Sequence, residues 1–205
     1  MSSDEKLLPG HHSIRLEHRD YRAPGTYFVT ICTYQRRCSL TKIAGDTTYL
    51  FPLGQIVHES WVAIPSHSAQ VNLHAFVVMP NHIHGLIEIA CQAGAQQAAP
   101  LQTAETEDRL AQVHPGSVGA IARSFKAAVT KRARAELGCT GEVWQRNYFE
   151  RVVRDGQEFS DVTRYIAENP MMWGCDRENP NARKPLTPGH AGAQHAAPLQ
   201  RKVLR

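Results

Sequence analysis

The sequence lacks the features that mark membrane-spanning, secreted and zinc-ribbon proteins. No uninterrupted apolar run approaches the roughly 20 residues that a membrane-spanning helix needs. The opening residues, MSSDEKLLPGHHS, contain no apolar segment of the kind that secretory signals carry. The five cysteines are scattered without a C-x-x-C pair, which fits a reducing compartment better than a disulfide framework. We therefore expect a cytoplasmic protein without a membrane partner.

The net charge is also small, at +4, but it is unevenly placed. Most of the excess positive charge lies in residues 117–154, where Lys and Arg clearly outnumber the acids. A concentrated basic segment in a near-neutral chain points to a polyanionic partner. A solvated helix face gives the same pattern, so charge alone leaves both interpretations open.

The spacing of apolar residues predicts a mixed chain of strands and helices, with one core in 205 residues. Segments rich in β-branched and aromatic residues predict strands at 24–34, 71–79 and 82–89. Apolar residues at helical spacing predict helices at 53–64, 118–137 and 156–168. The polar residues 35–52 are expected to form a connection. Ser117 and Gly138 are suited to cap the second helix, and Asn169-Pro170 to end the third.

Two segments differ in composition from the rest of the chain. Residues 91–116 are rich in Ala, Gln, Thr and Glu, and the tail 177–205 is rich in Pro. We expect a single domain over 1–176 with a flexible insert at about 91–116, followed by a flexible tail. The decapeptide AGAQQAAPLQ (93–102) returns as AGAQHAAPLQ (191–200). This repeat is too short for a solenoid, and our hypothesis is a translated DNA repeat.

The stretch VVMPNHIHGLIEI (77–89) places two histidines in an otherwise apolar strand. Because side chains alternate faces along a strand, His82 and His84 share a face with Leu86 and Glu88. Two neutral imidazoles at that spacing can converge on one divalent metal ion. A solvated strand face is the competing interpretation. Two ligands are too few for a structural zinc site, but open positions suit a catalytic metal.

The stretch VWQRNYFERVVR (143–154) mixes aromatic side chains with arginines. Trp144, Tyr148 and Phe149 could stack on unpaired bases while guanidinium groups hold phosphates. The Tyr148 phenol could instead attack a phosphodiester and keep its bond energy in a phosphotyrosine. The third interpretation is that Tyr148 is only a half-buried aromatic residue.

Several of these motifs together resemble those of one family. FVVMPNHIHGLIEI resembles the HUH motif (His, hydrophobic, His) of single-tyrosine transposases. Four other stretches resemble REP-associated tyrosine transposases, the branch linked to repetitive extragenic palindromes. They are VWQRNYFERVVR, YIAENP (165–170), YRAPGTYFVTICTYQRR (21–37) and SFKAAVTKRA (124–133). The resemblance covers about residues 12–175 and excludes the insert and the tail.

The resemblance implies an α+β fold, a ferredoxin-like (RRM-like) sandwich in which helices pack on an antiparallel sheet. It implies that His82 and His84 bind Mg²⁺ or Mn²⁺ and that Tyr148 is the catalytic residue. The activity would be nicking and joining of single-stranded DNA through a 5′-phosphotyrosine. Related enzymes take a further metal ligand from the helix that bears the tyrosine, and Glu150 is the nearest candidate by sequence.

The family's partner is single-stranded or hairpin DNA with palindromic sequence, and its members include monomers and homodimers. The residues expected to contact DNA are Arg123, Lys126, Arg146, Arg151 and Arg154. Two other functions are compatible with the same residues. One is a non-catalytic module that binds single-stranded nucleic acid by stacking. The other is a metallohydrolase that activates water and forms no covalent adduct.

Overall fold

The computed structural model describes residues 24–45, 47–90, 116–176 and 178–182. Almost the whole expected insert, both copies of the decapeptide and most of the tail lie outside these residues. The domain limits expected from the sequence therefore stay a prediction.

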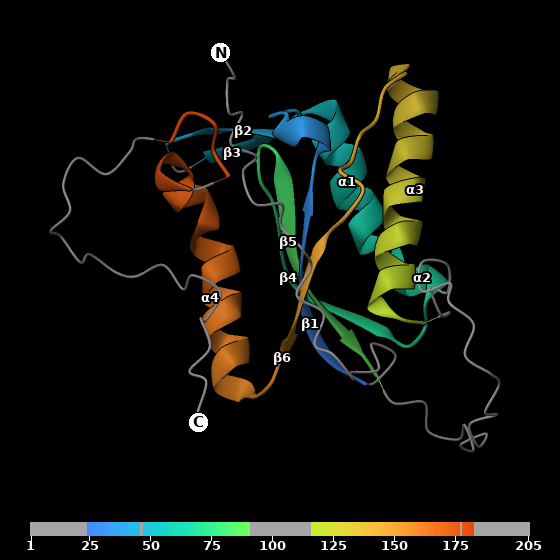
Figure 1. Cartoon of the computed structure of the whole chain (residues 1–205), viewed down its shortest axis with the longest axis vertical. Coiled ribbons are helices and arrows are strands. Elements are labelled where there is room, and N and C mark those ends of the chain that lie inside the picture. The colour runs from blue at the N-terminus through green and yellow to red at the C-terminus, as the bar shows by residue number, and fades with distance from the viewer. Residues whose placement is uncertain (1–23, 46, 91–115, 177, 183–205) are drawn as a thin grey trace, which may run out of the picture.

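A four-stranded antiparallel sheet forms the centre of the structure (Figure 1). Its strands, in spatial order, are β4 (Val71–Val78), β5 (His82–Ile89), β1 (Gly25–Cys32) and β6 (Phe149–Val153). Every neighbouring pair is antiparallel. One helix connects β1 to β4 and another connects β5 to β6, which gives the ferredoxin-like βαββαβ arrangement. The fold expected from the resemblance is confirmed.

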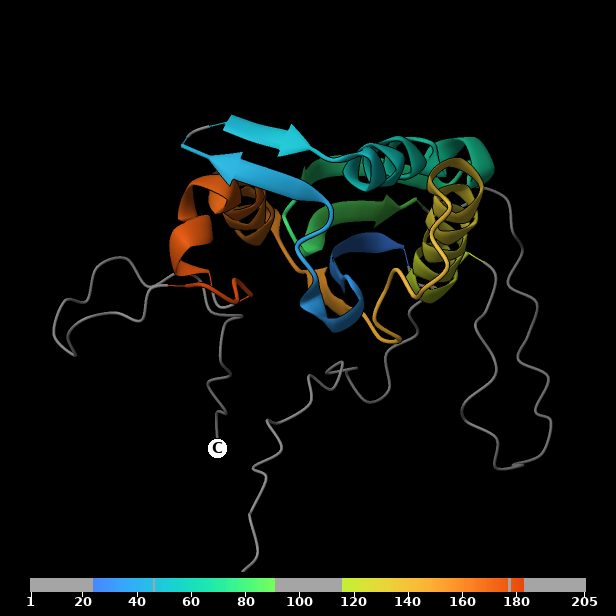
Figure 2. The same cartoon turned by 90° about the horizontal axis from the view of Figure 1, so that it is seen from above.

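Helices cover both faces of this sheet (Figures 1 and 2). Helices α1 (Pro52–Val62) and α3 (Val118–Leu137) pack on one face, where they enclose the larger core cluster. Helix α4 (Gly156–Met172) packs on the other face over a smaller cluster that includes Phe28, Leu86 and Ile166. Short helices lie at α2 (Ile64–His67), η1 (Tyr34–Arg36) and η2 (Trp173–Cys175). The two faces of β5 therefore meet different helices.

Helix α3 has the limits that its capping residues predict. The Ser117 side chain accepts a hydrogen bond from the Ala120 amide, and Gly138 ends the helix with a left-handed φ of 66°. Helix α4 is longer than predicted, because it continues past Pro170 to Met172. A proline removes only its own N–H from the helix ladder, so a helix near its end can run past it.

Two features of the structure were not predicted. A separate hairpin, β2 (Thr41–Ala44) and β3 (Thr47–Leu50), lies in the segment expected to be a connection. Every residue of β3 is exposed, so its sequence carries no apolar alternation. Strand β6 lies within the aromatic and basic stretch, where both faces carry a mixture of polar and apolar residues.

The histidine-bearing strand is held closely against the helices behind it. Gly85 lies between two residues of β5 whose side chains face α4, so its own position faces α1 and α3. A Cβ at Gly85 would be 2.2 Å from the Trp61 ring. Trp61 stacks on Phe76 with centroids 4.6 Å apart and meets the edge of Phe125 at 5.5 Å. The missing side chain lets the indole ring reach the backbone of β5, which fixes the strand.

Candidate active site

His82 and His84, called here the histidine pair, lie on the face of β5 that α4 covers. Their register partners on β1 are Cys32 and Thr30. The exposed fractions of the two histidines are 0% and 5%. Their Nε2 atoms are 3.1 Å apart. The prediction that the two imidazoles share a face and converge is confirmed.

Each ring is oriented by a partner at its other nitrogen. Nδ1 of His82 lies 2.8 Å from Oδ1 of the fully buried Asn81. The Asn81 amide nitrogen donates to the carbonyl oxygens of Arg36 (3.3 Å) and Glu178 (2.6 Å), so its Oδ1 is the acceptor. His82 therefore donates from Nδ1 and keeps a lone pair on Nε2. Nδ1 of His84 lies 2.8 Å from Oγ1 of Thr30.

Burial keeps both imidazoles neutral. Loss of solvent lowers the pKa of His84 from its ordinary value to about 3. Burial first, then the neighbouring His84 and Arg36, lower the pKa of His82 well below its ordinary value. At neutral pH both rings can use Nε2 as a donor to a metal ion, since coordination requires the neutral form.

A tyrosine from α4 meets the histidine pair. The Tyr165 hydroxyl lies 3.3 Å from Nε2 of His84, and the two ring centroids are 5.3 Å apart. Burial raises the pKa of Tyr165, against a lowering by a hydrogen bond from Asn169, and Asp176 adds to the rise. Tyr165 was not predicted as a site residue; it lies in YIAENP, which carries the resemblance but gives this tyrosine no role. Tyr165 lies on the same face of α4 as the buried Val162 and Ile166.

Asn169 lies one helical turn beyond Tyr165 on the same face of α4. Its side chain is 4% exposed, and among the described residues its Oδ1 has no hydrogen-bond partner. One turn further on, the Trp173 ring lies 6.1 Å from the His82 ring. Since Tyr165 meets His84 and Trp173 meets His82, Asn169 lies between them and alongside the histidine pair.

Tyr148 and Glu150 lie on the other face of the sheet. Glu150 is opposite Val29 in the register and is buried on the side of α1 and α3. The Tyr148 hydroxyl donates to Oε2 of Glu150 at 2.6 Å, and the ring packs against the larger core cluster. The expected position of Tyr148 beside the histidine pair is therefore incorrect. The cause is strand β6, whose alternation turns Glu150 away from α4.

The residues expected to contact DNA do not form one surface. Lys126 and Arg146 lie together, because Nζ of Lys126 donates to the Arg146 carbonyl at 2.9 Å. Arg151 faces α4 and pairs with Glu158 at 3.3 Å. Arg123 is exposed on α3 one turn before Lys126, and Arg154 is exposed after β6.

The expected stacking aromatics are not free for bases. The Trp144 side chain is 6% exposed, and its ring lies 5.8 Å from that of Phe125 in the core. Phe149 packs with its ring 6.4 Å from that of Phe28. Together with the hydrogen bond of Tyr148, these contacts remove the support for a platform of three stacked rings.

No three or more His, Cys, Asp or Glu side chains in the described ranges are grouped to hold a metal ion. Within the same ranges, no helix is long and apolar enough to cross a membrane.

Comparisons with known proteins give one sequence relative and a structural likeness. No family model matches the chain. An uncharacterized protein of Haemophilus influenzae is 41% identical over 170 residues, which is 82% of this chain and 93% of that protein.

Two solved structures with a similar fold are described as transposases. One is a REP-associated tyrosine transposase bound to a REP hairpin, with 18% identity, a TM-score of 0.47, and coverage of 77% of this chain and 73% of that chain. The other, from Deinococcus radiodurans, is described as a transposase and has 15% identity and a TM-score of 0.40 over 75% of this chain and 97% of its own.

Proposed function

The chain belongs to the same family as its Haemophilus influenzae relative, and we propose that it is a metal-dependent transposase that nicks and joins single-stranded DNA. The observation that carries this proposal is the meeting of three groups. Two neutral imidazoles present Nε2 atoms 3.1 Å apart, and the Tyr165 hydroxyl lies 3.3 Å from one of them. A nucleophile beside a two-histidine donor set suits phosphodiester cleavage.

The donor set at this site fits a divalent metal ion. Two nitrogens 3.1 Å apart can both reach one ion through bonds of about 2.1 Å. The Asn169 Oδ1, which lacks a partner among the described residues, is a suitable third donor. The carbonyl oxygen of Asn169, with open positions for water and phosphate oxygens, suits Mg²⁺ or Mn²⁺. Such an ion would polarise the scissile phosphate and leave the nucleophile to the protein.

Tyr165 takes the role that the sequence analysis gave to Tyr148. In the proposed step, the Tyr165 oxygen forms a bond to phosphorus and the bond from phosphorus to the 3′ oxygen breaks. The phenolic proton passes to solvent, and the leaving 3′ oxygen becomes a hydroxyl. Because burial raises the Tyr165 pKa, the phenol needs positive charge beside it to become a good nucleophile. Reversal of the step by another 3′ hydroxyl joins strands.

The proposed substrate is single-stranded DNA next to a hairpin. Its support is the excess of basic residues over 117–154 and the resemblance of the sequence motifs. The bound hairpin in the transposase structure is a property of that protein, and we extend it to this chain as part of the proposal.

Covalent adduct formation tests this proposal. Labelled single-stranded DNA from the region flanking the gene is incubated with the protein and Mn²⁺, and the products are separated on a denaturing gel. A slow band that protease removes is expected for the wild type. Tyr165→Phe should abolish this band, while Tyr148→Phe should leave it in place. An adduct that survives Tyr165→Phe would overturn the assignment.

The two competing functions give different results in the same assay. A metallohydrolase would cut the DNA without a protein-linked band. A binding module without catalysis would retain the DNA on a native gel and leave it uncut. Either result would refute the proposed transposase chemistry.

A further inference from the structure

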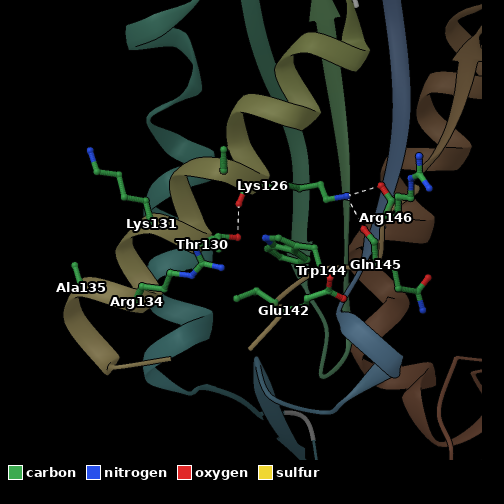
Figure 3. Close-up of a pocket in the computed structure, with 11 residues that line it drawn as sticks. Lys126, Thr130, Lys131, Arg134, Ala135, Glu142, Trp144, Gln145 and Arg146 are labelled. Carbon is green, nitrogen blue, oxygen red and sulfur yellow. Dashed lines mark hydrogen bonds between the residues drawn. The ribbon is translucent and has the colours of Figure 1, made fainter. Parts of the chain in front are cut away.

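A basic groove with a volume of about 750 Å³ lies between α3 and residues 142–146 (Figure 3). Helix α3 packs on the sheet face opposite to α4, so this groove is separate from the histidine pair. Within the described part of the chain, its charged lining consists of four cations and one carboxylate: Lys126, Lys131, Arg134, Arg146 and Glu142. None of these side chains lies at the histidine pair, although Lys126 and Arg146 are among the residues expected from the sequence to contact DNA.

Hydrogen bonds fix the wall of the basic groove. Nζ of Lys126 donates to the carbonyl oxygens of Gln145 (2.5 Å) and Arg146 (2.9 Å). Trp144 forms a bridge with Thr33 at the end of β1. Lys126 thus has a structural role in the groove wall, and its hydrogen bonds are drawn in Figure 3. The groove exists before a ligand arrives.

An unpartnered donor lines the same groove. Trp144 is 6% exposed, and its Nε1 is buried without a hydrogen-bond partner among the described residues. The Arg134 side chain extends toward Trp144 in Figure 3. Four cations against one carboxylate in the lining favour an anionic ligand such as a phosphate.

We propose that the basic groove binds the phosphodiester backbone of the DNA strand beside the cleavage point. This inference rests on the proposed function and adds a second contact site to it. Gln145 donates to the carbonyl of Cys32, which is the register partner of His82. The groove wall and β5 are therefore two strand spacings apart, about 10 Å.

Equilibrium binding tests the groove separately from chemistry. Fluorescence anisotropy is measured with a labelled hairpin that carries a single-stranded extension, using Tyr165→Phe protein so that no cleavage occurs. Lys131→Gln and Arg134→Gln in this background should each weaken binding about 5-fold and flatten the slope of log K against log salt by about 0.7–0.9. Both positions are exposed, so their replacement leaves the core intact.

The matched control is Arg164→Gln, which removes an exposed arginine that pairs with Asp161 on α4. Its affinity and salt slope should equal those of the parent. In a ¹⁵N spectrum, the indole N–H signal of Trp144, assigned with Trp144→Phe, should shift when DNA is added.

Unchanged affinity and slope in both groove variants, with a stationary indole signal, would overturn the inference. Adduct formation by the otherwise wild-type chain would then still support the proposed function. Binding through the groove without any adduct from that chain would instead refute the proposed function.

Discussion

Replacement of Asn81 by alanine should both destabilise the fold and weaken metal binding. Asn81 is 0% exposed, and its side chain makes three hydrogen bonds, to Nδ1 of His82 and to the carbonyls of Arg36 and Glu178. Its loss leaves the buried His82 N–H without an acceptor, at about 1–3 kcal/mol. The two carbonyl oxygens each lose one hydrogen bond, which costs less because each keeps a second lone pair. We therefore expect the free energy of unfolding to fall by about 2–4 kcal/mol in total.

The same change frees the His82 ring. Loss of the group that orients a ligating histidine typically lowers metal affinity about 10–100-fold. Urea unfolding gives the stability change, and titration with Mn²⁺ followed by electron paramagnetic resonance gives the affinity. Asn72→Ala is the control, because Asn72 is an exposed asparagine on β4 with a long 3.4 Å contact to Glu88. An Asn81→Ala protein that binds Mn²⁺ as tightly as Asn72→Ala would refute the role of Asn81.

Two further predictions concern β5. Gly85→Ala should lower the free energy of unfolding by about 1–3 kcal/mol, because its Cβ would meet the Trp61 ring, whereas Gly141→Ala, with open space around it, should unfold like the wild type in urea. Because the pKa values of the histidine pair are depressed in the folded protein, only the unfolded chain takes up protons at these histidines as pH falls from about 6.5 toward 3. The free energy of unfolding should therefore fall over this range, by up to about 1.4 kcal/mol per pH unit for each histidine. His84→Asn should flatten this slope and exposed His67→Asn should not; equal slopes would contradict the assignment.

Local signals explain which elements the sequence could predict. Helix α3 has an apolar stripe between Ser117 and Gly138, so its limits follow from nearby residues alone. Strand β6 carries Phe149 and Arg151 on one face and Glu150 on the other, so neither face is uniformly apolar. Its identity as a strand depends on pairing with β1, which lies far away in the sequence.

The residues of the candidate site also fall into two groups, those that local sequence predicts and those that depend on contacts between distant segments. The histidine pair could be predicted because alternation along a single strand places both rings together. Tyr165 could not, because its contact with His84 spans 81 positions and requires α4 to pack on the sheet. Tyr148 stood out by its arginine neighbours, but it lies just before β6 and its hydroxyl donates to Glu150 of that strand. Asn169 is recognisable only once its buried Oδ1 is seen without a partner among the described residues.

The site of DNA attachment in the covalent adduct tests the central claim most directly. Trypsin cleavage after Arg164 and Arg177 yields YIAENPMMWGCDR, whereas cleavage after Arg146 and Arg151 yields NYFER. After nuclease trimming, mass spectrometry should find the nucleotide remnant on the tyrosine of the first peptide. A remnant on NYFER, or no modified peptide at all from active protein, would contradict the account.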